Sequence, residues 1–226
     1  MRLRILFSKE ESLTYTSHLD LMRVWERALR RANVPLTYSQ GFNPRPKLQL
    51  AAALPLGYTG AAELLDVWLR QSMSVRDFTR VLVPVLPAGL TVNQVRQIML
   101  KEPAMQTQVV SAEYHVTVEW VPELACPEQS RRVEGWDEST EQVEARIERV
   151  LATTELLQER RGRQYDLRPL VEKLWLEQAG KDKVVLGMQL AARQGATARP
   201  EAVLEALGMN KAFTRYHRLR LVLDKG

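Results

Sequence analysis

Cysteine is almost missing from this sequence of 226 residues, which contains a single one, Cys126. One cysteine excludes an intrachain disulfide and any metal or iron–sulfur site built from several cysteines. Long apolar runs are missing too, since none approaches the roughly 18 residues of a membrane-spanning helix. The first residues have the pattern of a strand rather than that of an apolar secretion signal. We therefore expect a cytoplasmic protein with no membrane segment.

Several motifs of well-known catalytic sites are also missing. The sequence has no Gly-x-Ser-x-Gly nucleophile elbow, no Walker loop and no dinucleotide-binding fingerprint. His115 and His217 have no acidic or cysteine partner at the spacing of a metal site. We therefore expect no metal site and no cofactor, and the sequence assigns no catalytic residue.

Positive charge is concentrated at the beginning of the chain, whose formal net charge is +5. Residues 1–50 contain nine Lys and Arg against four Asp and Glu, whereas the remaining residues contain 23 of each sign. A local surplus of this kind favours partners that carry phosphates, because binding them releases counterions. A solvated helix face explains the same surplus without any partner.

The first hundred residues show the order strand–helix–strand–strand–helix–strand. Alternating apolar residues indicate the strands, and apolar residues at helical spacing indicate the helices. This order is the signature of a ferredoxin-like unit. The predicted elements are a strand at 2–7, a helix from Ser17 to about Asn33, strands at 48–54 and 63–69, a helix at 74–86 and a strand at 90–100.

The second half repeats this order, with a polar insertion predicted at residues 121–139. Trp25 and Trp175 lie in apolar stripes and are predicted to belong to the cores. The sequence therefore predicts an α+β fold of two tandem ferredoxin-like units with antiparallel sheets, residues 1–103 and 108–226. The elements predicted in the second unit are a strand at 112–120, helix 140–159, strands 171–177 and 184–192, a short helix ending at Gly208 and a strand at 213–223.

The first predicted helix is amphipathic, with a basic outer face. Ser17 is a suitable cap, and Asp20 three residues later completes a capping box. His18 stands at the helix N-terminus, where free amides and partial positive charge favour a phosphate. A surface histidine beside the cap is the simpler interpretation. The basic face consists of Arg23, Arg27, Arg30 and Arg31.

A stiff, cationic loop follows this helix at residues 38–47, with the sequence Tyr-Ser-Gln-Gly-Phe-Asn-Pro-Arg-Pro-Lys. Its two prolines favour an extended backbone, and its glycine permits a sharp bend. The loop offers two cations for phosphates and two aromatic rings for stacking. These residues are Tyr38, Gly41, Phe42, Asn43, Arg45 and Lys47.

Segments 17–20, 27–32 and 41–47 together resemble the radical SAM-linked protein family of bacteria. The resemblance implies no catalytic residue, but it implies a partner, because such domains are fused to or encoded beside radical S-adenosylmethionine proteins. With one cysteine, this chain cannot itself hold the three-cysteine cluster of those enzymes, so the resemblance implies an accessory protein. The similarity continues through 54–57, Glu63, Asp66, 166–169 and Arg199-Pro200.

These observations favour an accessory RNA-binding module, for tRNA or rRNA, that acts with a radical SAM protein. A metal-independent endoribonuclease of the repeat-RNA-processing type is an alternative, with His18 as general base and Lys47 or Arg45 on the scissile phosphate. A protein-interaction subunit without nucleic acid is another. The predicted phosphate-binding residues are His18, Arg23, Arg27, Arg30, Arg31, Arg45 and Lys47, with Tyr38 and Phe42 stacking and Gly41 and Asn43 shaping the loop.

Overall fold

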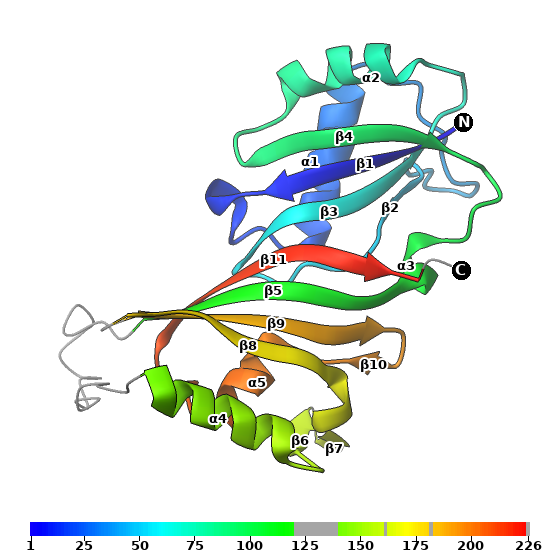
Figure 1. The fold of residues 1–226 in the computed structure, drawn as a ribbon. Helices are drawn as coiled ribbons and strands as arrows, with labels where there is room; N and C mark the ends of the chain where they lie inside the picture. The colour runs from blue at the N-terminus through cyan, green and yellow to red at the C-terminus, as the bar shows by residue number, and fades with distance from the viewer. Residues whose placement is uncertain (120–139, 161, 181–182, 225–226) are drawn as a thin grey trace. The chain divides into compact units, whose positions relative to one another are not determined.

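The computed structural model describes residues 1–119, 140–160, 162–180 and 183–224, and it shows a mixed α+β fold with mostly antiparallel sheet (Figure 1). This agrees with the predicted class. Two compact units are present, Met1–Val109 with Arg218–Gly226 as unit 1 and Val110–His217 as unit 2. The predicted insertion at 121–139 lies outside the described residues. No described helix is both long and apolar enough to cross a membrane.

Unit 1 has the predicted order of elements. Strand β1 lies between β3 and β4, and the short strand β2 pairs with β3, so these four strands lie in the order β2–β3–β1–β4. A short helix, α3, follows the last of these strands. The elements are β1 (Arg2–Lys9), α1 (His18–Arg31), β2 (Leu48–Leu50), β3 (Tyr58–Trp68), α2 (Val75–Leu82), β4 (Leu90–Ile98) and α3 (Met105–Gln108).

One face of the unit 1 sheet forms a hydrophobic core with α1 and α2. Alternate β1 side chains, Leu3, Ile5 and Phe7, are fully buried in it. The rings of Phe7 and Trp25 meet edge to face, with centroids 4.9 Å apart. The period of two in β1 and the helical period in α1 specify this contact, because each buries a single face of its element. Trp25 is buried as predicted.

The ends of α1 follow the predicted local chemistry. The Ser17 hydroxyl accepts a hydrogen bond from the Asp20 amide at 3.2 Å and donates one to the Asp20 carboxylate at 2.7 Å. The hydroxyl, and after it Arg23, lower the pKa of Asp20. Asn33 follows the helix in the left-handed conformation (φ 53°), which terminates it. Helix α2 is shorter than the predicted 74–86: it ends at Leu82 and continues as a 3₁₀ turn.

Unit 2 is built around strand β9, which pairs with β5 and β8. Helix α4 packs against β8. The last strand, β11, matches its predicted bounds and runs from unit 2 into unit 1, where Arg218 pairs with the buried Glu63. The elements are β5 (Val109–Glu119), α4 (Thr140–Ala152), β6 (Leu157–Arg160), β7 (Arg163–Asp166), β8 (Val171–Gly180), β9 (Lys183–Arg193), β10 (Ala196–Thr197), α5 (Pro200–Ala206) and β11 (Phe213–Leu223).

The predicted helix at 140–159 is wrong beyond Ala152. The guanidinium of Arg168 donates from Nε and Nη2 to the Leu151 carbonyl oxygen at 3.1 and 2.9 Å. The Thr153 hydroxyl donates to the Arg149 carbonyl oxygen at 2.8 Å. These bonds satisfy carbonyls that a longer helix would have used. Residues 157–160 instead form β6, which pairs with β7.

A cluster of buried charges lies on the other face of the unit 1 sheet. Asp66 is fully buried and accepts hydrogen bonds from both Arg2 and Arg4, which are each 2 % exposed. The Nε atoms of the two arginines lie 2.9 and 2.8 Å from the Asp66 carboxylate. Arg4 also reaches the carboxylate of Glu102 at 3.0 Å. The alternation of β1 predicted a half-buried strand, whereas pairing with Asp66 buries its polar side as well.

Lys9 is another buried cation of β1. Its ammonium group donates to three backbone carbonyl oxygens, those of Thr14, Thr16 and Tyr58, at 3.3, 3.1 and 3.1 Å. Burial lowers the pKa of Lys9. Three cations of the first ten residues thus hold the fold together in the interior.

We predict that Asp66→Asn destabilises the protein by about 3–5 kcal/mol, because it leaves the buried Arg2 guanidinium without its counter-charge and leaves Arg4 with only the partly exposed Glu102. Urea unfolding followed by circular dichroism measures the loss. Glu119→Gln is the control, since it removes a carboxylate from the exposed pair with Arg215 and should cost less than about 1 kcal/mol. Equal losses for the two variants would contradict a structural role for the buried cluster.

A second prediction concerns Gly187 on β9, which pairs with Trp175. The half-buried indole lies over Gly187 and donates to Glu177 at 2.6 Å; a Cβ on Gly187 would be 2.0 Å from the ring. Gly187→Ala should cost about 1–3 kcal/mol in the native background. In the Trp175→Ala background it should be neutral or stabilising by up to about 1 kcal/mol, because alanine suits a strand better than glycine. The same loss in both backgrounds would contradict this packing.

Candidate functional site

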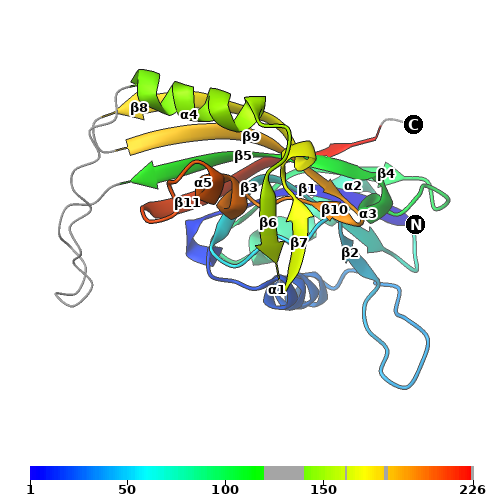
Figure 2. The ribbon, with the colours of Figure 1, turned by 90° about the horizontal axis from the view of Figure 1, so that it is seen from below.

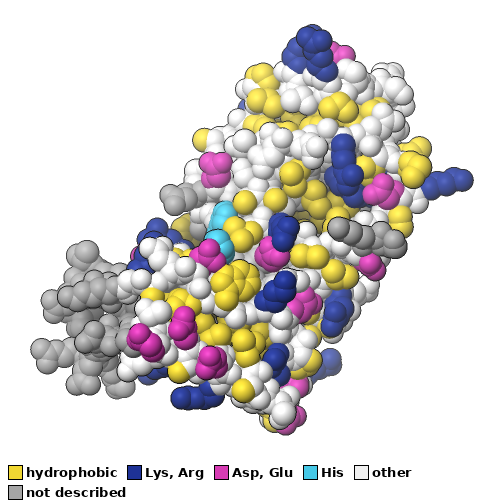
Figure 3. Space-filling view, viewed as in Figure 1, with side chains coloured by type: hydrophobic (Ala, Val, Ile, Leu, Met, Phe, Trp, Pro, Cys, Tyr) yellow, Lys and Arg dark blue, Asp and Glu magenta, His cyan; other side chains and the backbone are white. Residues whose placement is uncertain are grey.

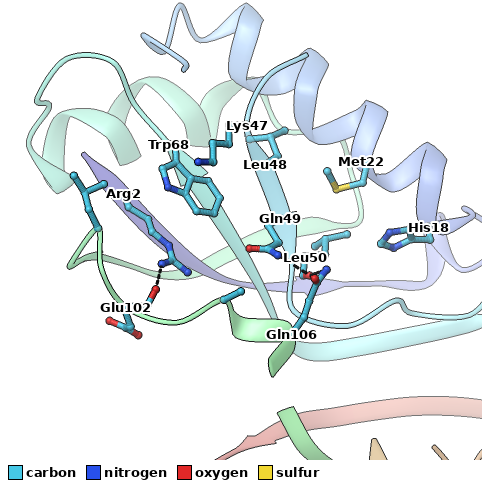
Figure 4. Close-up of a pocket in the computed structure, with 12 residues that line it drawn as sticks. Arg2, His18, Met22, Lys47, Leu48, Gln49, Leu50, Trp68, Glu102 and Gln106 are labelled. Atoms are coloured by element: carbon cyan, nitrogen blue, oxygen red, sulfur yellow. Dashed lines mark hydrogen bonds between the residues drawn. The ribbon is translucent and has the colours of Figure 1, made fainter. Parts of the chain in front are cut away.

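A pocket of about 610 Å³ lies beside strand β2 in unit 1 (Figure 4). Its walls come from the start of β1, the first turns of α1, strand β2, the end of β3 and residues 100–106. Apolar side chains, among them Met22, Leu48 and Leu50, form part of the lining. The polar and aromatic part includes Arg2, His18, Lys47, Gln49, Trp68 and Gln106.

Three neighbouring segments place Arg2, Trp68 and Lys47 in one row. Trp68 pairs with Arg2 across β3 and β1, and its amide donates to the Lys47 carbonyl oxygen at 3.2 Å. Arg2 Cζ and Lys47 Nζ lie 4.8 and 4.9 Å from the Trp68 ring centroid, and the ring lies between them (Figure 4). Such cation–π contacts position a cation without neutralising it.

The two cations of this row differ in their availability. Arg2 is buried and uses its guanidinium on Asp66 and on the backbone carbonyls of Glu102 and Pro103. Lys47 is exposed and forms no ion pair with any residue that the structure describes. Lys47 is therefore the cation of this row that a ligand can reach.

Two glutamine amides stand in the middle of the pocket. Gln49 Nε2 donates to Gln106 Oε1 at 3.0 Å, and Gln106 Nε2 donates to the Leu50 carbonyl oxygen at 3.1 Å. The second bond ties α3 to β2. The pair retains the Gln49 carbonyl oxygen and one N–H of each amide for further hydrogen bonds.

His18 extends from the first turn of α1 into the pocket (Figure 4). Its Nδ1 atom is buried and has no hydrogen-bond partner among the described residues. Buried polar atoms in proteins are rarely left unpaired. A polar group of a ligand beside His18 would satisfy this atom.

The outer face of α1 carries the predicted arginines, all of them exposed. Arg23 pairs with Asp20 at 2.9 Å, as expected for an i, i+3 pair near the helix start. Arg30 Cζ lies 6.0 Å from the centroid of the Tyr38 ring, which joins the helix face to the loop. Arg27 and Arg31 form no ion pair with any described residue, so their charges face solvent.

The loop at 38–47 is closed at its base and projects from the strands of unit 1 (Figure 2). Ser39 and Arg45 exchange two hydrogen bonds, from the Ser39 amide to the Arg45 carbonyl at 2.8 Å and from the Arg45 amide to Ser39 Oγ at 3.0 Å. Gly41 adopts φ +128°, which a residue with a side chain rarely accepts. The Phe42 side chain is fully exposed (106 %). The loop thus exposes an aromatic ring to solvent, and its base is held by the two hydrogen bonds between Ser39 and Arg45.

Only part of the predicted set of residues meets in space. His18 and Lys47 line the same pocket, whereas the other predicted cations and the aromatic rings lie on the helix face or in the loop, outside its lining. Sequence reasoning missed Arg2, Trp68 and the two glutamines. One feature of the sequence could have pointed to Trp68. Asp66 and Trp68 alternate with apolar residues in β3, so both lie on one face of the strand, opposite the apolar face.

Burial also changes the meaning of the charge surplus. Arg2, Arg4 and Lys9 belong to the nine cations of residues 1–50, but they are buried. The accessible positive charge of this region therefore comes from α1 and the loop. On the face shown in Figure 3, basic side chains stand among acidic and apolar ones; α1 lies behind the strands in that view. Among the described residues, no group of His, Cys, Asp and Glu could hold a metal ion.

Comparisons with known proteins give a family and a likeness of fold. A family model described as "Uncharacterized protein conserved in bacteria (DUF2344)" matches residues 2–200. No curated protein matches the sequence. The fold of this chain is similar to that of one chain in a Cbf5–Nop10–Gar1 complex (TM-score 0.53). It is also similar to that of one chain in the archaeal box H/ACA sRNP Nop10–Cbf5 complex (TM-score 0.50). Identity is 10 % in both cases, so the likeness concerns the fold.

A third similar chain comes from an H/ACA RNP bound to a substrate RNA containing 2′-deoxyuridine, with a TM-score of 0.51 and 10 % identity. All three likenesses cover 97 % of this chain but only 48, 47 and 47 % of the other chains. The chain thus spans about half the length of the chains it resembles.

Proposed function

The chain belongs to this conserved bacterial family, and we propose that it is an accessory protein of the cytoplasm that binds RNA, tRNA or rRNA, through unit 1. The observation that carries this proposal is the continuity between α1 and the loop. Exposed arginines of α1 reach the loop through Arg30 and Tyr38, and the loop presents Phe42. Cations that track a backbone, combined with exposed rings for bases, are the usual means of binding single-stranded nucleic acid.

The fold supports the same proposal. We propose that both units are ferredoxin-like, with residues 1–103 and 108–226 as a tandem pair. The order β2–β3–β1–β4 with two helices on one face supports this for the first unit. One of the similar chains comes from a structure described as an H/ACA RNP bound to a substrate RNA, which supports RNA as the first ligand to test.

The endoribonuclease alternative has one observation in its favour, the presence of His18 and Lys47 in the same pocket. A general base of this type needs a group that fixes its tautomer and orientation. His18 Nδ1 lacks such a partner among the described residues. Recognition of RNA is therefore the better supported function.

We predict that the purified protein retains tRNA or rRNA fragments on a filter, with an affinity that falls as salt rises. The triple variant Arg27→Glu, Arg31→Glu, Arg45→Glu should weaken binding of all RNAs, whatever their nucleotide sequence. It should also reduce the slope of log K against log salt concentration by about 0.7 for each lost phosphate contact. Phe42→Ala should cost about 1–3 kcal/mol of binding if its ring stacks on a base.

The matched control reverses Arg76, Arg80 and Arg96, which are also exposed in unit 1 but lie on α2 and β4 rather than on α1 or the loop. It should bind RNA nearly as the native protein does. Binding without salt dependence, or equal losses in the two variants, would contradict the proposed surface. RNA that is cut in the presence of a chelator by the native protein, but not by His18→Ala, would support the nuclease instead.

We further propose that a radical SAM protein is the partner served, on the strength of the motifs at 17–20, 27–32 and 41–47. We predict that affinity-tagged protein recovers a radical SAM protein encoded in the same genome when the two are co-expressed, with or without ribonuclease. Recovery that depends on intact RNA would indicate an indirect association. No recovery from co-expressing cells would contradict the partnership and leave RNA binding untouched.

A further inference from the structure

We propose that the pocket beside Trp68 is a binding site for one nucleoside monophosphate, either a nucleotide of the bound RNA or a free nucleotide. This rests on the proposed function and deepens it, because it assigns a base-and-phosphate site distinct from the arginine face of α1. The volume of about 610 Å³ falls within the range of about 300–1,000 Å³ typical of small-molecule sites.

The phosphate would bind at Lys47. This ammonium is exposed and held 4.9 Å from the Trp68 ring centroid. The acid in the pocket lining, Glu102, is already engaged by Arg4 at 3.0 Å and does not neutralise Lys47. A cation fixed in direction but not paired is suited to a phosphate, since the charge-assisted bond is formed with the ligand alone.

The base would bind along the wall formed by α1 and β2. Met22 and Leu48 supply apolar surface there, and Met adapts its shape to flat ligands. The Gln49–Gln106 pair offers one carbonyl oxygen and two N–H groups, which match the mixed donors and acceptors of a base edge. The unpartnered Nδ1 of His18 adds a polar atom at the same wall.

Trp68 itself has a positioning role in this site. Its ring lies between Arg2 and Lys47, which occupy the positions that a stacked base would need (Figure 4). The structure therefore assigns the contacts with the base to the two glutamine amides and the apolar wall. The role of Trp68 is to orient Lys47 toward the phosphate. Stacking on exposed aromatic rings is left to the loop.

Equilibrium dialysis of the full chain with AMP, GMP, CMP and UMP, and with the matching nucleosides and inorganic phosphate, tests the site. At least one monophosphate should bind with a dissociation constant below about 1 mM. Lys47→Ala should weaken that binding about tenfold or more, to the level of the nucleoside. Gln49→Leu should weaken the nucleotide and the nucleoside alike. Lys173→Ala and Gln97→Leu, which change exposed residues outside the pocket, are the controls and should bind as the native protein does.

The outcomes separate the pocket from the proposed function, because RNA retention is measured in parallel. RNA binding without monophosphate binding, and with no effect of Gln49→Leu on RNA affinity, would overturn the pocket and leave the RNA function standing. Monophosphate binding without RNA retention would support the pocket and overturn the RNA function. Inorganic phosphate binding as tightly as every nucleotide would overturn base recognition, and nucleosides binding as tightly as monophosphates would overturn the role of Lys47.

Discussion

Unit 1 depends on the interaction between the buried carboxylate of Asp66 and the guanidinium groups of Arg2 and Arg4. These two arginines of β1 converge on the carboxylate, and an unpaired guanidinium in the interior would be strongly destabilising. The Arg2 guanidinium also donates to the backbone carbonyls of Glu102 and Pro103. It thereby fixes the segment that leads to α3. That segment brings Gln106 to the edge of β2. The position of the pocket wall therefore depends on one buried anion near the end of β3.

Burial divides the cations of the first fifty residues into two groups. Those of β1 are buried and act within the fold, whereas those of α1 and the loop remain in water. Because a buried, paired charge attracts no partner, net charge over a stretch of sequence overstates the charge available for binding. The basic surface that remains accessible is smaller than the charge surplus of residues 1–50 indicated. It is nevertheless continuous from Arg30 to the loop through Tyr38.

Local features of the fold could be predicted because their causes are local. The cap at Ser17, the stop at Asn33 and the alternation of β11 each depend on a few neighbouring residues. The prediction failed for the end of α4, where a distant residue, Arg168, donates two hydrogen bonds to the Leu151 carbonyl oxygen in the last turn of the helix. Pattern alone has no access to such a contact, since the helical period of the sequence continues past Ala152.

The sequence by itself determined the α+β class, the order of elements in unit 1 and the surplus of positive charge in the first fifty residues, because these follow from periodicity, capping and composition. Only the tertiary structure decided which polar residues meet. Arg2, Trp68 and Lys47 come from three separate segments, and the pairing register of the strands aligns them. His18 and Gln106 join them from two helices. Strand register and helix docking are set by the core as a whole, which is why the sequence pointed to the loop while the structure added the pocket at its base.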